Sequence, residues 1–126
     1  MAKADLQATV DKALLKGHIL RQNLVTEHLR QAINGLHEIS LIGPTWHEVF
    51  AGEVTVKIGG WTMAFFNDCD SLDYLDSAID AHGAACDFDW WYDNGGDPLD
   101  YLNATERDRL YRILSELQPN PEDNRR

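Results

Sequence analysis

An α+β fold is predicted for this chain of 126 residues, and three observations predict it. Apolar residues recur at helical spacing near both ends, the middle alternates polar and apolar residues around a Gly-Gly pair, and an aspartate-rich aromatic segment lies between that pair and the last helical pattern. We therefore expect an N-terminal helical segment, one β-hairpin, an acidic aromatic loop region and a C-terminal helix around a single core. The length favours one domain, residues 1–126, with 1–22 as a candidate helical extension and 119–126 as a frayed tail.

The N-terminal segment, residues 4–34, has apolar residues at steps of three and four in two successive registers. Gly17 lies between the registers, where it could mark a bend, a break or a tolerated glycine. If the helix breaks, Asn23 or Thr26 could cap the second part, and Gly35 is placed to end it. The apolar stripe is wider than one core contact needs, so it could pack on two sides of its own core or bind a partner or a second copy of the chain. Its candidate partner-binding residues are Leu14, Ile19, Leu20 and Leu24.

The clearest local pattern is a hairpin. Residues 53–58 and 61–66 are joined by Gly59-Gly60, and a two-residue turn of this kind tolerates the positive φ angles that it requires. The expected opposed pairs are Ile58 with Trp61, Val56 with Met63 and Val54 with Phe65. All six side chains then share one face, so strand register and apolar pattern agree. Residues 36–52 are expected to be a connector, in which Thr45 caps a short helical turn.

Beyond the hairpin, Leu72, Leu75 and Ile79 have the spacing of a short helix. Asp97-Pro98 is typical of a helix start, because aspartate accepts from free amides and proline fits the first turn. A capping pair of Asn103 and Glu106 then predicts the last helix, which is expected to run to about Leu117.

The net charge of −10 comes entirely from one segment. Residues 67–103 hold ten aspartates and no Lys or Arg, whereas elsewhere eleven acids balance eleven bases. Binding phosphates needs clustered bases, so neither nucleic acid nor an anionic membrane is expected as a partner. A basic protein partner is favoured, or the charge simply confers solubility. The chain also lacks an apolar run of the roughly 18 residues that a span requires, and a signal peptide, so we expect a cytoplasmic protein.

Catalytic and metal signatures are weak. Cys69 lies between two aspartates, which suppress the thiolate, so no catalytic residue is assigned. The cluster Asp68–Asp73 offers oxygen ligands but departs from the calcium-loop pattern, so solvated or capping aspartates are the favoured interpretation. No metal and no cofactor is therefore expected. The two cysteines, Cys69 and Cys86, match no redox motif; they could form a bridge in an oxidising compartment, and in the cytosol we expect free thiols.

The segment Asp87–Asp93 combines rings with acids and is the second candidate partner-binding region. Tryptophan and tyrosine dominate binding hot spots, and carboxylates accept from arginine donors. Core packing of the rings is the competing interpretation, because three consecutive large rings cannot all be exposed in a monomer. The candidate partner-binding residues here are Trp90, Trp91, Tyr92, Asp87, Asp89 and Asp93.

From Trp46 onward the order of features resembles a small bacterial domain family of unknown function that is common in pseudomonads. The residues that carry the resemblance are Trp46–Phe50, Gly52, Gly60-Trp61, Phe66–Asp70, Leu72–Tyr74, Asp97-Pro98 and 106–114, within a matching region of about 24–117. Many relatives have another cysteine after the tyrosine, where this chain has Leu75-Asp76-Ser77, which counts against a two-cysteine site. Relatives also tend to lack the first twenty or so residues, so residues 1–21 would be an elaboration of this member.

In size and general character the chain is also similar to a pseudomonad quorum-sensing antiactivator, a type of protein that binds a LuxR-type transcription regulator. That resemblance implies a non-enzymatic inhibitor acting through its N-terminal helix. The leading hypothesis is thus a non-enzymatic regulatory protein that binds and inhibits a protein partner. The alternatives are a metal-binding protein or enzyme using Asp68–Asp73, and an acidic immunity-type or nucleic-acid-mimic inhibitor.

Overall fold

The computed structural model describes residues 3–119 and has the predicted α+β class. Its centre is a five-stranded antiparallel sheet in which each strand pairs with the next along the chain. The strands are β1 (Ile39–Ile42), β2 (Ala51–Ile58), β3 (Trp61–Asp68), β4 (Leu72–Ile79) and β5 (Ala85–Asp87). The sheet is therefore much larger than the single predicted hairpin. Most of the tail predicted as frayed, residues 120–126, lies outside the described residues, as do Met1 and Ala2.

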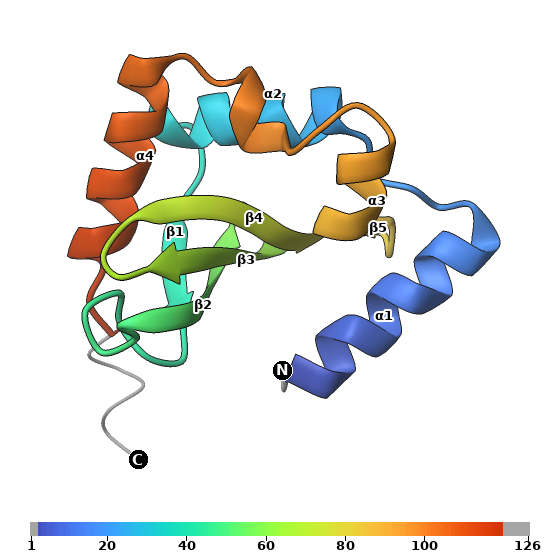
Figure 1. Ribbon diagram of the computed structural model, residues 1–126, viewed down its shortest axis with the longest axis horizontal. Coiled ribbons are helices and arrows are strands. Elements are labelled where there is room, and N and C mark those ends of the chain that lie inside the picture. The colour runs from blue at the N-terminus through green and yellow to red at the C-terminus, as the bar shows by residue number, and fades with distance from the viewer. Residues whose placement is uncertain (1–2, 120–126) are drawn as a thin grey trace.

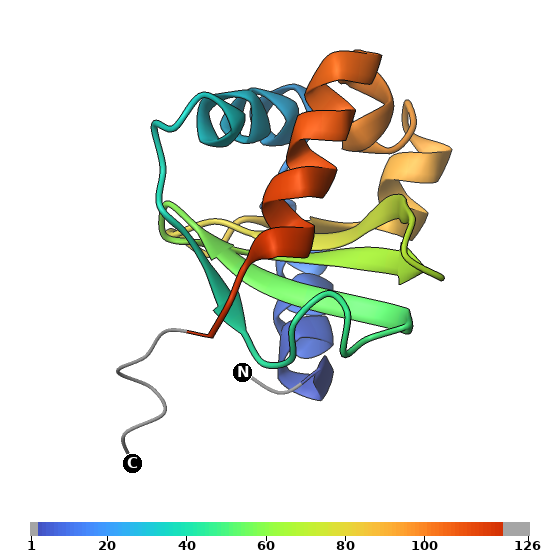
Figure 2. The same cartoon turned by 90° about the vertical axis from the view of Figure 1, so that its left-hand side faces the viewer.

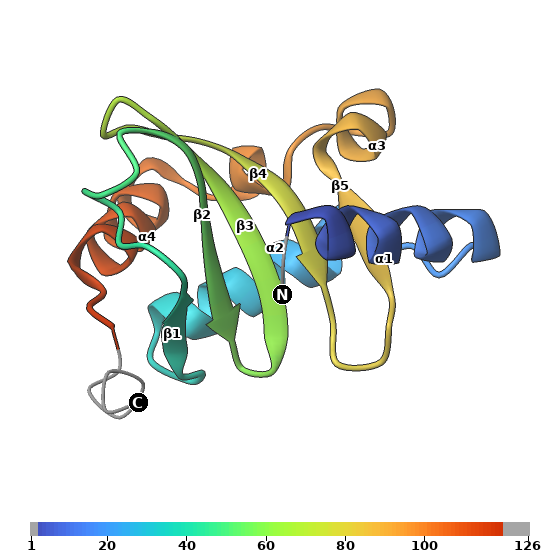
Figure 3. The same ribbon diagram turned by 90° about the horizontal axis from the view of Figure 1, so that it is seen from below.

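Helices cover both faces of this sheet. They are α1 (Lys3–Lys16), α2 (Gln22–Ile33), α3 (Phe88–Asp93), the 3₁₀ helix η1 (Pro98–Tyr101) and α4 (Ala104–Glu116). Figures 1 and 2 show α2 and α4 over one face of the sheet and α1 on the other. Seen from below, α1 crosses β4 and β5 (Figure 3). The main core lies between the sheet and the α2/α4 layer.

The N-terminal segment is two helices rather than one. Gly17 has a φ of 73°, a conformation that L side chains rarely adopt, and the chain turns there. The predicted caps are wrong: α2 follows Arg21, which makes no side-chain cap, and Asn23 and Thr26 both lie within the helix. Gly35, with a φ of 81°, ends α2 as predicted, and its amide donates to the Ala32 carbonyl at 3.0 Å.

The predicted hairpin is confirmed, including its register. Ile58 pairs with Trp61, Val56 with Met63 and Val54 with Phe65. Of these six side chains, all but the half-buried Trp61 are fully buried under the helices. The alternation of polar and apolar residues predicts this register because one face of the hairpin packs on the core.

The prediction of a short helix at residues 72–79 is wrong, because this segment is β4. Two irregularities interrupt its pairing with β3, and the register with β3 skips the positions of Asp73 and Asp76. Each bulge inserts one residue, so the inward side chains Leu72, Leu75 and Ala78 recur every three positions instead of every two. The bulges thus give a strand the apolar spacing of a helix.

The connector and the C-terminal part follow the expected local chemistry, although β1 within the connector was not predicted. Thr45 and Glu48 exchange hydrogen bonds in a turn, with the Thr45 amide donating to Glu48 at 2.9 Å. Asp97 caps η1, and the Asn103–Glu106 capping box at the start of α4 is present in full. In each of these contacts the two residues are at most three positions apart in the sequence, so the contact forms locally.

Candidate acidic–aromatic binding site

A cavity of about 450 Å³ opens between β4, α3 and the segment that leads into η1. We call it the acidic–aromatic pocket. Its lining residues are Asp73, Tyr74, Phe88, Tyr92, Gly95, Gly96, Asp97 and Asp100. Its volume lies in the range of roughly 300–1,000 Å³ that is typical of ligand sites. The walls thus combine three aromatic rings with three carboxylates and no base.

The rings form a continuous series along one wall. The Tyr74 ring lies parallel to Phe66 with centroids 5.0 Å apart, and its centroid lies 4.5 Å from that of Phe88. Phe88 in turn lies 5.8 Å from Tyr92, which is 71% exposed. Such separations are favourable for aromatic pairs, so the series extends from the sheet to a solvent-exposed edge.

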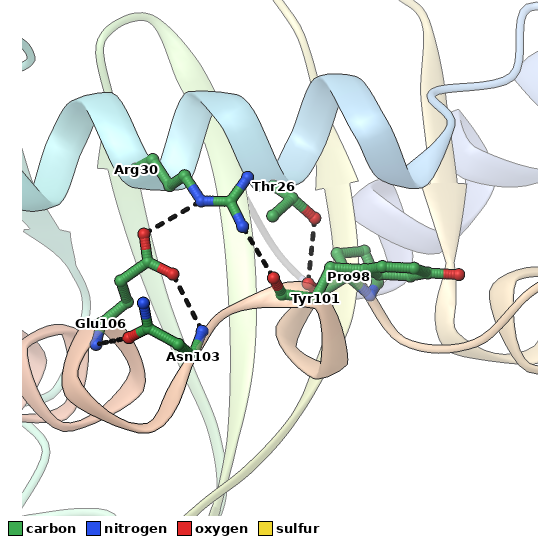
Figure 4. Close-up of polar contacts among 6 residues, drawn as sticks. All are labelled: Thr26, Arg30, Pro98, Tyr101, Asn103 and Glu106. Atoms are coloured by element: carbon green, nitrogen blue, oxygen red, sulfur yellow. Dashed lines mark hydrogen bonds and ion pairs between the residues drawn. The ribbon is translucent and has the colours of Figure 1, made fainter.

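The segment from residue 95 to 100, which also lines the pocket, is held by one polar stripe of α2. Gln22, Thr26 and Arg30 recur every four residues and therefore share a helix face. Gln22 donates to the carbonyls of Asn94 and Gly96, both at 3.0 Å. Thr26 donates to the Pro98 carbonyl at 2.9 Å (Figure 4).

Arg30 completes this attachment. Its guanidinium donates to the Tyr101 carbonyl at 2.7 Å and pairs with Glu106 at 2.9 Å. Glu106 also closes the capping box with Asn103 (Figure 4). The loop from residue 94 to α4 is therefore fixed to α2 at several points, and contacts within the chain hold this wall of the pocket in place.

Asp97 is the most deeply placed acid of the pocket and is only 5% exposed. Its carboxylate accepts from the amide of Leu99 at 3.1 Å and from that of Leu75 at 3.3 Å. Burial raises the pKa of Asp97 to about 6; the two amides act against this rise, Asp100 adds to it and Arg107 opposes it. Loss of hydration therefore outweighs the hydrogen bonds to the charged form.

The predicted rings at residues 90–92 have three different environments. Trp91 is fully buried and its indole donates to the Leu20 carbonyl at 3.0 Å, so no surface of it remains for a partner. Trp90 is half-buried beneath Arg21, whose guanidinium carbon lies 5.3 Å from the ring centroid. Tyr92 is the exposed ring of the three. The run thus contains one core ring, Trp91, and one exposed ring, Tyr92.

The three acids predicted in this run also differ in their environments. Asp87 is the N-cap of α3 and accepts from the Trp90 amide at 3.0 Å, so its carboxylate has a structural role. Asp89 and Asp93 are exposed on α3. Sequence reasoning did not single out Asp73, Tyr74, Asp97 and Asp100 as one site, because they come together only through the bulged strand and the fixed loop. The four-residue spacing of polar residues on α2 was the one available signal.

The predicted apolar contacts of the N-terminal segment are mostly internal. Leu20 is buried in the main core, and Leu14 and Ile19 are half-buried against it. Leu24 is 56% exposed. Burial of Leu20 leaves nothing for a partner to contact, and the wide stripe is explained because α1 and α2 meet opposite faces of the sheet.

The segment Asn67–Asp70 serves the fold. Asn67 is buried and donates to the carbonyls of Trp46 and Val49 at 2.9 and 2.6 Å. Asp70 accepts from the Trp46 indole and the Tyr111 hydroxyl, both at 2.9 Å, and these bonds lower its pKa. In this segment, Cys69 and Asp70 have positive φ angles of 51° and 70°, respectively. This turn joins the residue 45–50 loop to the sheet and to α4.

The two thiols are free, one exposed at Cys69 and one buried at Cys86. Burial raises the pKa of Cys86 to about 12, and desolvation together with Asp68 raises that of Cys69. Both shifts oppose thiolate formation. Within residues 3–119, no three His, Cys, Asp or Glu side chains gather in a group that could hold a metal ion.

A family model for a domain of unknown function, DUF7693, matches residues 19–116. The chain belongs to this family. The DUF7693 region includes the whole acidic–aromatic pocket and the Asn67–Asp70 turn, whereas α1 precedes it. No curated protein and no solved structure matches the chain, and the resemblance to a quorum-sensing antiactivator finds no support in these comparisons. No helix within residues 3–119 has the length and apolar character needed to cross a membrane.

Proposed function

We propose that this protein is a non-enzymatic binding protein that captures a protein partner through a basic segment. Its contact surface would be the acidic–aromatic pocket together with the exposed acids Asp89 and Asp93 on α3. The observation that carries the proposal is an ordered pocket whose walls hold only aromatic rings, carboxylates and backbone. Rings supply contact area at small entropic cost, and carboxylates attract a basic partner and accept its donors.

The rival functions have less to support them. An enzyme or metal site at Asp68–Asp73 would need Asp70, whose carboxylate already accepts from Trp46 and Tyr111. A nucleic-acid mimic would need Asp87, Asp89 and Asp93 together, and Asp87 is used as a helix cap. An interface on the N-terminal helices would need Leu14, Ile19 and Leu20, which contribute to the core.

The test compares captured proteins between two matched triple variants of the full chain. The site variant carries Asp89→Asn, Tyr92→Ala and Asp93→Asn. The control variant carries Glu27→Gln, Phe50→Ala and Glu38→Gln, which remove the same charge and one exposed ring elsewhere. We expect wild type and control to retain the same partner from a lysate of the source cells at low salt, and the site variant to lose it. Equal retention by both variants, or no partner for wild type, would contradict the proposal.

A further inference from the structure

We propose that the acidic–aromatic pocket receives one arginine side chain of the partner, with its guanidinium lying against the Tyr74–Phe88–Tyr92 rings and donating to the carboxylates. This inference rests on the proposed function and specifies the group that is recognised. The same cavity is lined by aromatic rings, whose faces attract cations, and by carboxylates. Few ligands satisfy both kinds of group at once.

A planar cation fits this arrangement better than a compact one. Guanidinium groups stack on aromatic faces and present several donors in a fixed fork, whereas an ammonium is a strongly hydrated point charge. The fork matches carboxylates placed on separate elements, here Asp73 on β4, Asp97 before η1 and Asp100 within η1. Arginine is therefore favoured over lysine at this pocket.

Asp97 gives the pocket a buried acceptor. Its two amide donors occupy two of roughly four acceptor positions of a carboxylate, which leaves capacity for a ligand's N–H groups. The cost of burying this group is already met by the fold, and the fixed loop from residue 94 onward keeps it in position. A bound cation would thus find its acceptor pre-organised.

The charges around Asp97 predict how binding depends on pH. Asp100 and Asp73 also line the cavity, and Arg107 on α4 is the base that acts on Asp97. A guanidinium favours the ionised carboxylate, so binding should release a proton where Asp97 is still partly protonated. Affinity for arginine is therefore expected to rise between pH 5 and 7, near the raised pKa of about 6.

The experiment is an NMR titration of the full-length ¹⁵N-labelled protein with acetyl-Gly-Arg-Gly-amide at low salt. The control peptide replaces arginine with citrulline, which keeps the shape and loses the charge, and a second peptide carries lysine. We expect shifts confined to the amides of Tyr74, Phe88, Tyr92, Gly95 and Gly96 with the arginine peptide, weaker ones with lysine and none with citrulline. Equal response to arginine and citrulline, or no response at millimolar arginine peptide, would overturn the inference.

Two variants test the site itself. Asp100→Asn removes an exposed pocket charge, and we expect it to weaken the arginine peptide about tenfold, as the loss of one charge-assisted hydrogen bond does. Asp108→Asn is the control, an exposed acid on α4 that lies outside this cavity. Asp97→Asn should abolish the rise in affinity with pH; because Asp97 also caps η1, its folding is checked from the spectrum. A tenfold loss in the control, or an unchanged Asp100→Asn, would contradict the assignment.

The results also separate the two proposals. If the protein partner is lost from the triple site variant but retained by Asp100→Asn, and no arginine peptide binds, then the surface binds a protein without an arginine in the pocket. If the arginine peptide binds as described and no protein is captured, the pocket assignment stands and the proposed function fails.

Discussion

At the scale of single residues, the buried polar side chain of Asn67 is expected to contribute strongly to the stability of the fold. This side chain is 1% exposed, donates to two loop carbonyls and accepts from the Asp70 amide at 2.8 Å. Removing a partner from buried polar groups costs about 1–3 kcal/mol for each group left unsatisfied. We expect Asn67→Ala to lower the free energy of unfolding by about 3 kcal/mol in urea denaturation. The control Asn23→Ala, on the exposed side of α2, should change it by less than about 0.5 kcal/mol; equal effects would show that the network does not stabilise the turn.

His28 is the residue whose titration should affect folding most directly. Its ring lies between Trp61 and His37, at centroid distances of 3.8 and 4.3 Å, and Nε2 lies 2.8 Å from the Ile58 carbonyl, to which it donates. Burial lowers the pKa of His28, and the neighbouring His37 lowers it further. The unfolded chain therefore binds a proton first, so this contribution to stability is complete above about pH 6.5 and is lost as the pH falls toward the folded-state pKa.

The measurement is the free energy of unfolding between pH 5 and 7.5 for wild type and His28→Gln, which keeps a donor for Ile58. We expect the stability difference between the two proteins to shrink as the pH falls below about 6.5. Asp97 acts with the opposite sign, because its raised pKa makes the folded state lose relative stability as the pH rises from about 4 to 6. That contribution is common to both proteins, and a difference that does not depend on pH would refute the assignment to His28.

At the scale of elements, α2 orders the pocket through its polar stripe. Gln22 donates to carbonyls on both sides of Gly95, a residue whose carbonyl also accepts from the Tyr101 hydroxyl. We expect Gln22→Ala to speed hydrogen exchange of the Asn94 and Gly96 amides, which donate to the Trp91 carbonyl, by about tenfold, since one or two hydrogen bonds of the loop are lost. The effect of Gln22→Ala on the free energy of global unfolding should be smaller than its effect on this local exchange. The neighbouring Asn23→Ala is the control, and unchanged exchange in Gln22→Ala would mean that the loop is fixed by other contacts.

The elements that could be predicted from the sequence are those whose determinants are local. The Gly59-Gly60 turn and the Asn103–Glu106 capping box bring their partners together within a few residues, and both were predicted with the observed pairing. β4 was mispredicted because its two bulges, at Asp73 and Asp76, give it helical spacing. The same bulges help to build the pocket. The candidate site could therefore not be predicted, because the strand β4 that carries part of it was not predicted. The apolar spacing of residues 72–79 fits a helix or a bulged strand, and only the pairing with β3, a non-local contact, distinguishes the strand from the helix.

At the scale of the whole molecule, the fold consists of two unequal cores on opposite faces of one sheet. The larger core lies under α2 and α4 and contains the two fully buried tryptophans, Trp46 and Trp91. The smaller core consists of Leu6, Val10 and Ala13 of α1 on the ends of β4 and β5. Only the larger one lies wholly within the family-matched residues 19–116. The pocket is built on that part, so its integrity should not depend on α1.

Substituting one residue of α1 tests this independence. Val10 is fully buried, and Val10→Asp would place a charge in the smaller core, where it has no partner. We expect α1 to detach and then to unfold, because a free helix of 14 residues is marginal in water. Far-UV circular dichroism should lose about one helix, while the tryptophan fluorescence and any binding at the pocket should remain. Leu15→Asp, at a position that is 89% exposed on the same helix, is the matched control and should change neither signal. If Val10→Asp also altered the tryptophan signal, the two cores would fold as one cooperative unit, and α1 would be an integral part of the domain that carries the pocket.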